Sequence, residues 1–375
     1  MKLRARYLET LLFNHPDKVP FEPGQPRETT LLRWQEEGLT DPEHWFEQLW
    51  SAAGLDGERP IVHTKSLDVN FRMIPTFTEK VLEHRDGHYI VQDWMGNITE
   101  ISDTYDFTYL RNPRDFVTRK WHRFPVENRH DFEAMKQRYD PHDPLRWPSS
   151  AEISSAPRQD RDRFVWLPFS GVFWQLREWC GFEPLCRLLV DDPEFVQEMA
   201  DFWRQFVLTV MDRALATATV DGLHISEDMA YKEKSMISPA MTRKYLLPAW
   251  SAWIDRAKQA GVKIFDMDSD GCIDELIPIW IEAGFNVCDP IEVAAGCDIN
   301  QYRKRFGKAM AFRQGVDKRC IAAGGKAIEQ ELERIAPVVQ DGGYIPGCDH
   351  GVPPDVSWPD FIHYARKLAH MTGWL

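Results

Sequence analysis

The feature that most constrains the fold of this chain is a repeated alternation of short apolar runs with longer helical patterns. From about residue 162 onward, each apolar run ends in polar or glycine residues, and a helical segment follows before the next run. This order is typical of βα units, in which parallel strands alternate with crossover helices. The runs that qualify as strands are 164–171, 222–228, 263–270, 286–292, 308–315 and 343–349.

Helix-start signals and a further apolar run extend this pattern toward a closed barrel. Asp192-Pro193 and Ser238-Pro239 each place an N-cap residue before a proline at the first helical position. Residues 18–24 have the same form of a short strand ending in a polar turn, and we expect one more strand between residues 60 and 150. Because eight βα units close into a TIM (β/α)8 barrel, we predict a single barrel domain over residues 1–375.

The stretch 60–150 departs from the βα pattern, and we predict it to be an insertion on the barrel. Runs that alternate apolar and polar residues flank a turn at Arg85-Asp86-Gly87, which is typical of an antiparallel hairpin. These runs are 68–77, 79–83 and 88–92. Residues 112–147 are rich in Pro, Asp, His and Arg, so we expect them to pack on the barrel surface without a further strand.

The composition excludes several classes of protein. With 45 Lys+Arg against 58 Asp+Glu, the net charge is -13 and no basic stretch alternates with aromatic residues, so nucleic acid is not an expected partner. No run approaches the roughly 18 apolar residues that cross a bilayer, so no membrane partner is expected. Glu9 interrupts the basic start before an apolar signal segment can form. We therefore expect a cytoplasmic protein whose seven cysteines are reduced thiols.

The C-terminal ends of the predicted strands carry a dense set of ionisable residues. In a TIM barrel these ends line the mouth where the chemistry takes place. The set is His224, Glu227, Asp228, Asp266, Asp268, Asp270, Asp289, Glu292, Arg313, Cys348, Asp349 and His350. A single carboxylate here can equally cap the following helix, but the set as a whole indicates an active site.

Three of these carboxylates lie at alternate positions of one strand, so their side chains share one face. Asp266, Asp268 and Asp270 would repel one another unless a divalent cation, a cationic substrate, a neighbour such as Arg313 or protonation of one acid relieves them. If Cys348 reaches the same site, the mixed thiolate and carboxylate donors favour zinc over magnesium. The alternative for Cys348 is a half-buried structural thiol.

The most distinctive segment of the chain runs from Gly342 to Trp358. Its glycines and prolines form a turn that can bring Cys348, Asp349 and His350 to the barrel mouth. There His350 can act as an acid, a base or a metal ligand, and its alternative is an exposed turn histidine.

This segment, with others at strand ends, resembles the uroporphyrinogen decarboxylase superfamily. The other matching segments are 19–24, 224–228, 265–271 and 313–318, and the resemblance covers most of residues 17–373. Within the superfamily the chain is more similar to the branch that includes cobalamin-dependent methyltransferases. The resemblance implies the methyltransferase subunit of a corrinoid-dependent system. Such a subunit moves a methyl group between a small methylated substrate, such as a methoxy-aromatic compound, or a C1 carrier, and a separate cobalamin protein.

Two departures from the superfamily pattern bear on the site. The family decarboxylases carry Met-Arg-Gln-Ala-Gly-Arg near the N-terminus, whereas residues 22–27 read Glu-Pro-Gly-Gln-Pro-Arg, so a tetracarboxylate substrate would lack its arginine clamp. The methyl-transferring members hold zinc with a His-x-Cys pair and a later Cys. Here Asp268-Ser269-Asp270 stands at the pair and Cys348 at the last position. The resemblance therefore implies zinc, a Lewis acid, on Cys348 and Asp268, with Glu227 or His224 as the replacement ligand and Glu227 preferred.

The remaining strand-end residues complete the predicted site. We expect acid or base roles for Asp270, His350 and His224, and substrate contacts from Arg27, Asp266, Arg313 and Trp174, the last either in the core or beside an aromatic substrate. Nothing resembles the Asp-x-His-x-x-Gly loop that binds cobalamin, so the corrinoid arrives on a partner protein. Two alternatives stay open: a metal-free decarboxylase of a small organic acid, and a noncatalytic protein that binds a cationic ligand.

Overall fold

A parallel sheet of seven strands, whose spatial order follows the chain, forms the centre of the molecule. This computed structural model describes residues 1–55, 62–111, 113, 115, 117–147 and 162–375. The strands are β1 (Thr64–Ser66), β6 (Phe164–Ser170), β7 (Gly222–Ser226), β8 (Ile264–Asp268), β9 (Val287–Asp289), β10 (Ala311–Arg313) and β11 (Tyr344–Ile345). All the strands predicted beyond residue 162 are present, and β1 is the strand expected between residues 60 and 150. The predicted α/β class with a parallel sheet is confirmed.

The N-terminal segment is extended but does not form the strand predicted at 18–24. It lies beside the chain that leaves β11, because Pro26 bridges Val352 in parallel and the amide of Cys348 donates to the carbonyl of Pro23 at 3.1 Å. The described residues therefore give seven paired strands in the parallel sheet, and the closed eight-stranded barrel stays a prediction.

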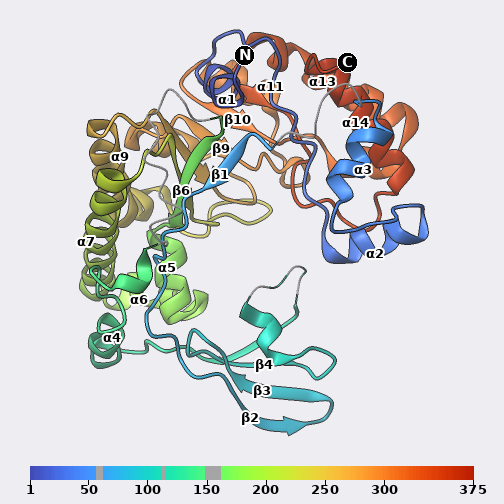
Figure 1. The fold of residues 1–375 in the computed structure, drawn as a ribbon. Helices are drawn as coiled ribbons and strands as arrows, with labels where there is room; N and C mark the ends of the chain where they lie inside the picture. Colours follow the sequence, from blue (N-terminus) through green and yellow to red (C-terminus); the bar gives the residue numbers. More distant parts are fainter. Residues whose placement is uncertain (56–61, 112, 114, 116, 148–161) are drawn as a thin grey trace.

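The described residues form fourteen α-helices, and those that come after β6 follow the parallel strands and lie around the outside of the parallel sheet (Figure 1). The helices are α1 (Leu3–Leu11), α2 (Glu28–Glu36), α3 (Trp45–Ala52), α4 (Arg129–Lys136), α5 (Val172–Cys180), α6 (Phe182–Asp191), α7 (Pro193–Thr217), α8 (Pro239–Met241), α9 (Leu247–Gln259), α10 (Ile277–Ala283), α11 (Ile299–Phe306), α12 (Lys318–Ala323), α13 (Gly325–Asp341) and α14 (Trp358–Met371). The predicted helix starts are confirmed, since Asp192 and Ser238 accept hydrogen bonds from the amides of Phe195 and Met241 at 3.1 and 3.2 Å. None of the described helices is long and apolar enough to span a membrane.

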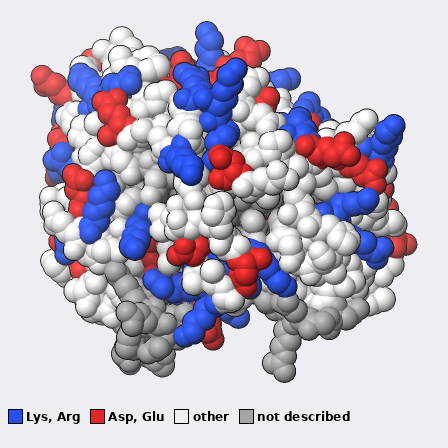
Figure 2. Space-filling view, turned by 90° about the horizontal axis from the view of Figure 1, so that it is seen from above, with Lys and Arg blue, Asp and Glu red and all other residues white. Residues whose placement is uncertain are grey.

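One end of the parallel sheet is closed by α1. Tyr7 and Leu11 of this helix pack on a cluster from the first halves of the strands, including Phe164, Ile264 and Val287. Figure 2 looks onto the end of the molecule that carries both termini in Figure 1, and there basic and acidic side chains are interspersed. The C-terminal strand ends, which carry the ionisable residues, lie at the opposite end of the sheet from α1.

A second, antiparallel sheet of four strands forms from the N-terminal third. Its strands are β2 (Lys80–Arg85), β3 (His88–Gln92), β4 (Ile98–Ser102) and β5 (Lys120–Arg123), and it lies apart from the parallel sheet on the side of α5 (Figure 1). The predicted hairpin turn is confirmed, because Asp86 and Gly87 between β2 and β3 have positive φ values of 49° and 74°. Two predictions for this region are wrong: 68–77 contains no strand, and 112–147 contains β5 and α4 among its described residues.

Candidate functional site

Four charged side chains from neighbouring strands meet at the C-terminal end of the parallel sheet. Pairing of β7 with β8 sets His224 beside Asp266, and pairing of β8 with β9 sets Asp268 beside Asp289. Asp266 Oδ2 lies 2.9 Å from His224 Nδ1 and accepts a hydrogen bond from Arg313 Nη1 at 2.7 Å. The same Arg313 nitrogen lies 3.1 Å from Asp289 Oδ2. We call His224, Asp266, Asp289 and Arg313 the strand-end cluster.

Burial and charge act in opposite directions on the protonation of this cluster. Burial lowers the pKa of His224, but its hydrogen bond with Asp266 and the neighbouring carboxylates outweigh this and raise the pKa to about 9. Burial also raises the pKa of Asp266, yet Arg313 and His224 hold it below its ordinary value. For Asp289 burial prevails over Arg313, so its pKa lies well above the ordinary range. The cluster therefore holds one firmly ionised carboxylate next to one that readily keeps a proton.

The strand-end cluster contains three potential metal ligands. Among the described residues, His224, Asp266 and Asp289 form the one group whose ligand atoms all lie within 4.8 Å of one another. The Oδ1 atoms of Asp266 and Asp289 are buried and have no hydrogen-bond partner, so each keeps a lone pair available. One imidazole and two carboxylates suit zinc or a similar divalent cation. Arg313 opposes an added cation here, since its guanidinium already neutralises the carboxylates.

Glu227, predicted as a metal ligand, is used instead to hold the start of α5. Its Oε1 accepts hydrogen bonds from the amide of Val172 at 2.8 Å and from the indole of Trp250 at 2.7 Å. Its Oε2 accepts from the amide of Trp174 at 3.0 Å. A Cβ at Gly171 would lie 2.1 Å from the Glu227 carboxyl carbon, so only glycine fits there. Burial raises the pKa of Glu227 to about 7, although these hydrogen bonds lower it.

Cys348 does not join Asp268 and Glu227, so the predicted ligand set is not brought together. The Cys348 side chain is 0% exposed within the hydrophobic core, where it packs against Gly24 of the N-terminal segment. Burial raises the pKa of this thiol to about 12, which leaves it protonated at neutral pH. The reason for the difference is that Cys348 lies beyond the short strand β11, where the crossing N-terminal segment covers it.

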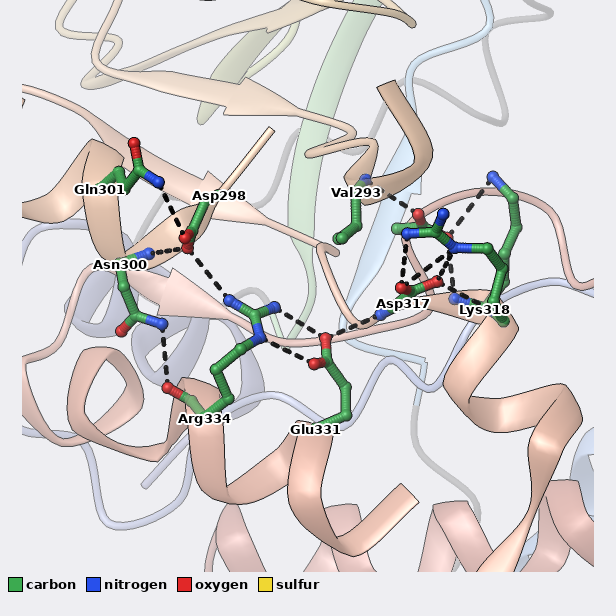
Figure 3. A network of polar contacts seen from close by, with 10 residues as sticks. Val293, Asp298, Asn300, Gln301, Asp317, Lys318, Glu331 and Arg334 are labelled. Atoms are coloured by element: carbon green, nitrogen blue, oxygen red, sulfur yellow. Dashed lines mark hydrogen bonds and ion pairs between the residues drawn. The ribbon is translucent and has the colours of Figure 1, made fainter. Parts of the chain in front are cut away.

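Asp349, next to Cys348, is also a structural group. Its carboxylate accepts hydrogen bonds from the amides of Val293 at 3.0 Å and Lys318 at 3.2 Å, which fixes the loops after β9 and β10 to each other. A neighbouring network continues this role: Arg334 links Asp298 to Glu331, and Glu331 accepts from the amide of Asp317 (Figure 3). These charges hold helices α11, α12 and α13 in place.

His350 turns away from its neighbours in sequence and meets the end of β8. Its Nε2 lies 3.1 Å from Asp270 Oδ2, and its Nδ1 lies 3.5 Å from Arg27 Nη2. The hydrogen bond with Asp270 raises the pKa of His350. Asp270 also lines a cavity of about 420 Å³ with Tyr231 and Glu292. Asp270 and His350, for which separate acid or base roles were predicted, thus lie within hydrogen-bond distance of each other.

Asp268 lies beside His224 of the strand-end cluster and two residues before Asp270. Its Oδ2 is 3.7 Å from His224 Nε2, and burial raises its pKa, as does the nearby charge of Asp270, although His224 lowers it. Trp174 lies at the start of α5, where its indole nitrogen donates to Glu178 at 2.8 Å, and its contact with a substrate stays a prediction.

Two residues of this site had no role assigned to them from the sequence. Asp289 was among the ionisable residues at the predicted strand ends, and that position was the signal for a ligand role. Glu22, 3.7 Å from Arg313, had no clear signal because its segment is not a regular strand.

Comparisons with known proteins place the chain near two kinds of enzyme. No protein-family model matches it. A uroporphyrinogen decarboxylase from Edwardsiella ictaluri (strain 93-146) is 37% identical over 79 residues, which cover 20% of this chain and 22% of that protein. Another from Pseudomonas syringae pv. syringae (strain B728a) is 21% identical over 229 residues, 58% of this chain and 63% of that protein. The matches thus span less than two thirds of these relatives.

A solved structure described as a methyltransferase from Methanosarcina mazei resembles the chain over its full length. The match has a TM-score of 0.59 and covers 99% of both chains at 13% identity, which shows a common fold. The resemblance predicted from the sequence is confirmed at this level: the chain is similar in sequence to uroporphyrinogen decarboxylases and in fold to a methyltransferase.

Proposed function

We propose that the chain is a methyltransferase with a closed TIM barrel that moves a methyl group between a small methylated substrate and a corrinoid carried by a separate protein. The observation that carries this proposal is the strand-end cluster of metal-ligand donors, which lies at the same end of the sheet as the partly exposed Asp270–His350 pair. The fold shared with a methyltransferase supports it. The seven free cysteines suit a reducing compartment, and we infer a cytoplasmic location from them.

Zinc on His224, Asp266 and Asp289 would supply a Lewis acid that polarises the atom bearing the methyl group. The residues themselves support such a site, because Asp266 and Asp289 each keep a buried oxygen without a protein partner. Arg313 stays beside them and neutralises part of their charge. We expect it to weaken the binding of the cation while it keeps the two acids close together.

His350 has the properties of a proton donor to the group that loses its methyl. Its hydrogen bond with Asp270 favours the protonated imidazole, and both side chains are partly exposed, at 25% and 41%. General acid catalysis of this kind contributes about 10² to 10⁴ in rate. Arg27, 3.5 Å from His350, is placed to orient the imidazole or a bound substrate.

The alternative of a metal-free decarboxylase is less well supported by the geometry. A carboxylate substrate would need cations, but the guanidinium of Arg313 is already shared by Asp266 and Asp289. This leaves Arg27 and the protonated His350. The other carboxylates at the mouth, Asp268 and Asp270, would repel such a substrate. We therefore retain decarboxylation only as an outcome that the assay below can reveal.

The proposal is tested by metal analysis together with a methyl-transfer assay. The purified chain is mixed with cob(I)alamin and a panel of O-, N- and S-methylated compounds, and methylcobalamin is followed by absorbance. We expect stoichiometric zinc and transfer from one compound class. Both should be lost in Asp289→Asn and kept in Asp212→Asn, a surface carboxylate paired with Arg256 on α9. Carbon dioxide release without metal, or ligand binding without turnover, would contradict it.

A further inference from the structure

A second hollow lies outside the strand-end cluster, at the antiparallel sheet. It has a volume of about 650 Å³ and is formed between the segment that leads into β2 and the turn that joins β3 to β4. Its lining includes three aromatic rings, two arginines and one acid: Phe77, Trp94, Phe107, Arg72, Arg111 and Glu79. Nothing in the proposed methyl transfer uses these residues.

The aromatic wall of this hollow is held in place by its surroundings. The amide of Phe77 donates to the carbonyl of Trp94 at 2.9 Å, and a Cβ at Gly96 would lie 2.8 Å from the Phe77 ring. The Arg138 guanidinium packs over the Phe77 ring at 3.8 Å from its centroid. Asp93 fixes the turn by accepting from the amides of residues 95 and 97. The wall is therefore preformed, which lowers the cost of binding a ligand.

Two buried polar atoms on this lining have no partner in the protein. The side chain of Glu79 is 6% exposed, and only its Oε2 is used, in an ion pair with Arg111. Its Oε1 and the indole Nε1 of Trp94 are buried without a hydrogen bond. An unmet buried donor or acceptor is costly, so a ligand that supplies both bonds would be bound favourably.

The guanidinium of Arg72 is not held in a close ion pair by a described residue. Burial raises the pKa of Glu178, and the charge of Arg72 lowers it from a greater distance. Its guanidinium lies 5.1 Å from the centroid of the Trp94 ring, and no ion pair within 4.0 Å joins it to a carboxylate in the described part of the chain. Arg111, the other cation of the hollow, is already paired with Glu79. The available charge therefore favours an anion beside an aromatic surface.

We propose that this hollow binds a small aromatic carboxylate that carries a ring hydroxyl. The carboxylate pairs with Arg72 and accepts from the Trp94 indole, the ring packs on the aromatic wall, and the hydroxyl donates to Glu79 Oε1. The assignment rests on the cavity, its unmet polar atoms and a guanidinium without a close ion pair among the described residues, and it does not depend on the chemistry at the strand-end cluster.

Isothermal titration calorimetry on the intact chain tests the site with four probes. 4-Hydroxybenzoate should bind, while its uncharged methyl ester and cyclohexanecarboxylate should bind about tenfold more weakly or worse, because the ester lacks the charge and cyclohexanecarboxylate lacks both the aromatic ring and the hydroxyl. Benzoate, which lacks only the hydroxyl, should bind with intermediate affinity. Equal binding of the acid and its ester, or no binding of the acid, would overturn the proposal.

Substitutions locate the binding and separate it from the strand-end cluster. Arg72→Gln should weaken 4-hydroxybenzoate by about tenfold, and Trp94→Phe, which keeps a ring but removes the indole N–H, by less. Arg85→Gln, at the far tip of the same sheet, is the matched control and should bind as the parent does. Binding that survives Arg72→Gln but disappears in Asp289→Asn would place the ligand at the strand-end cluster and refute this site.

Discussion

The strand-end cluster and the segment that follows β11 are both buried and both rich in polar groups, but their partners differ. In the cluster, Asp266 and Asp289 meet charged side chains and each keeps an oxygen without a partner. In the segment after β11, Asp349 accepts from two backbone amides and lies 3.6 Å from the Lys318 ammonium, while Cys348 has apolar contacts. A carboxylate whose oxygens both have protein partners stabilises the fold, whereas one that keeps an oxygen without a partner can take up a proton or a cation. The oxygens without a partner therefore distinguish the candidate site from its scaffold.

His350 tests this comparison most directly. It belongs to the segment after β11 by sequence, but its side chain contacts Asp270 of the candidate site. We expect His350→Gln to lower kcat for methyl transfer by about 10² to 10⁴, since it removes a proton donor. The free energy of unfolding should change by less than about 1 kcal/mol, because the side chain is partly exposed. His363→Gln on α14 is the control. Full activity in His350→Gln would show that His350 does not donate a proton in the reaction.

Arg313 tests whether charge holds the strand-end cluster together. Replacement by methionine leaves the buried Asp289 without this cation and Asp266 with only His224, and removing one partner of a buried ion pair costs about 3 to 5 kcal/mol. Urea denaturation measures this loss. The same change at Arg319, which is 61% exposed and pairs with Asp317, should cost well under half as much. Equal losses in the two variants would mean that burial does not distinguish the regions.

The protonation of His224 predicts a pH dependence for the metal-free chain. Its folded pKa of about 9 lies above the ordinary value of 6.5. The stabilisation is therefore fully present below pH 6.5 and is lost as the pH rises through 9. Urea denaturation with a chelator should show that the free energy of unfolding falls by on the order of 2 kcal/mol between these two pH values. This is less than the pKa shift of His224 alone implies, because the ring is partly exposed. His224→Gln should flatten the curve; a curve unchanged in this variant would assign the dependence to another group.

The fold was largely predictable from local patterns, whereas the site was predictable only where strand geometry governs it. Apolar runs and capping residues located the strands and helix starts, and the even spacing of Asp266 and Asp268 placed both on one face. Glu227 lies three positions after His224, an odd spacing that turns it to the other face, toward α5. Cys348 was not predictable in this way, because its burial depends on the distant N-terminal segment that packs over it.

Cys348→Ala gives the smallest expected effect and sharpens the comparison most directly. The thiol is buried and protonated, so its removal should cost about 1 kcal/mol of unfolding free energy through lost packing alone. Zinc content and methyl transfer should equal those of the parent chain, measured by elemental analysis beside Asp289→Asn. Loss of stoichiometric zinc in Cys348→Ala, with zinc retained in Asp289→Asn, would mean that the segment after β11 holds the metal and the strand-end cluster does not. It would require the segment after β11 to open toward the mouth, because Gly24 and the core now cover the thiol.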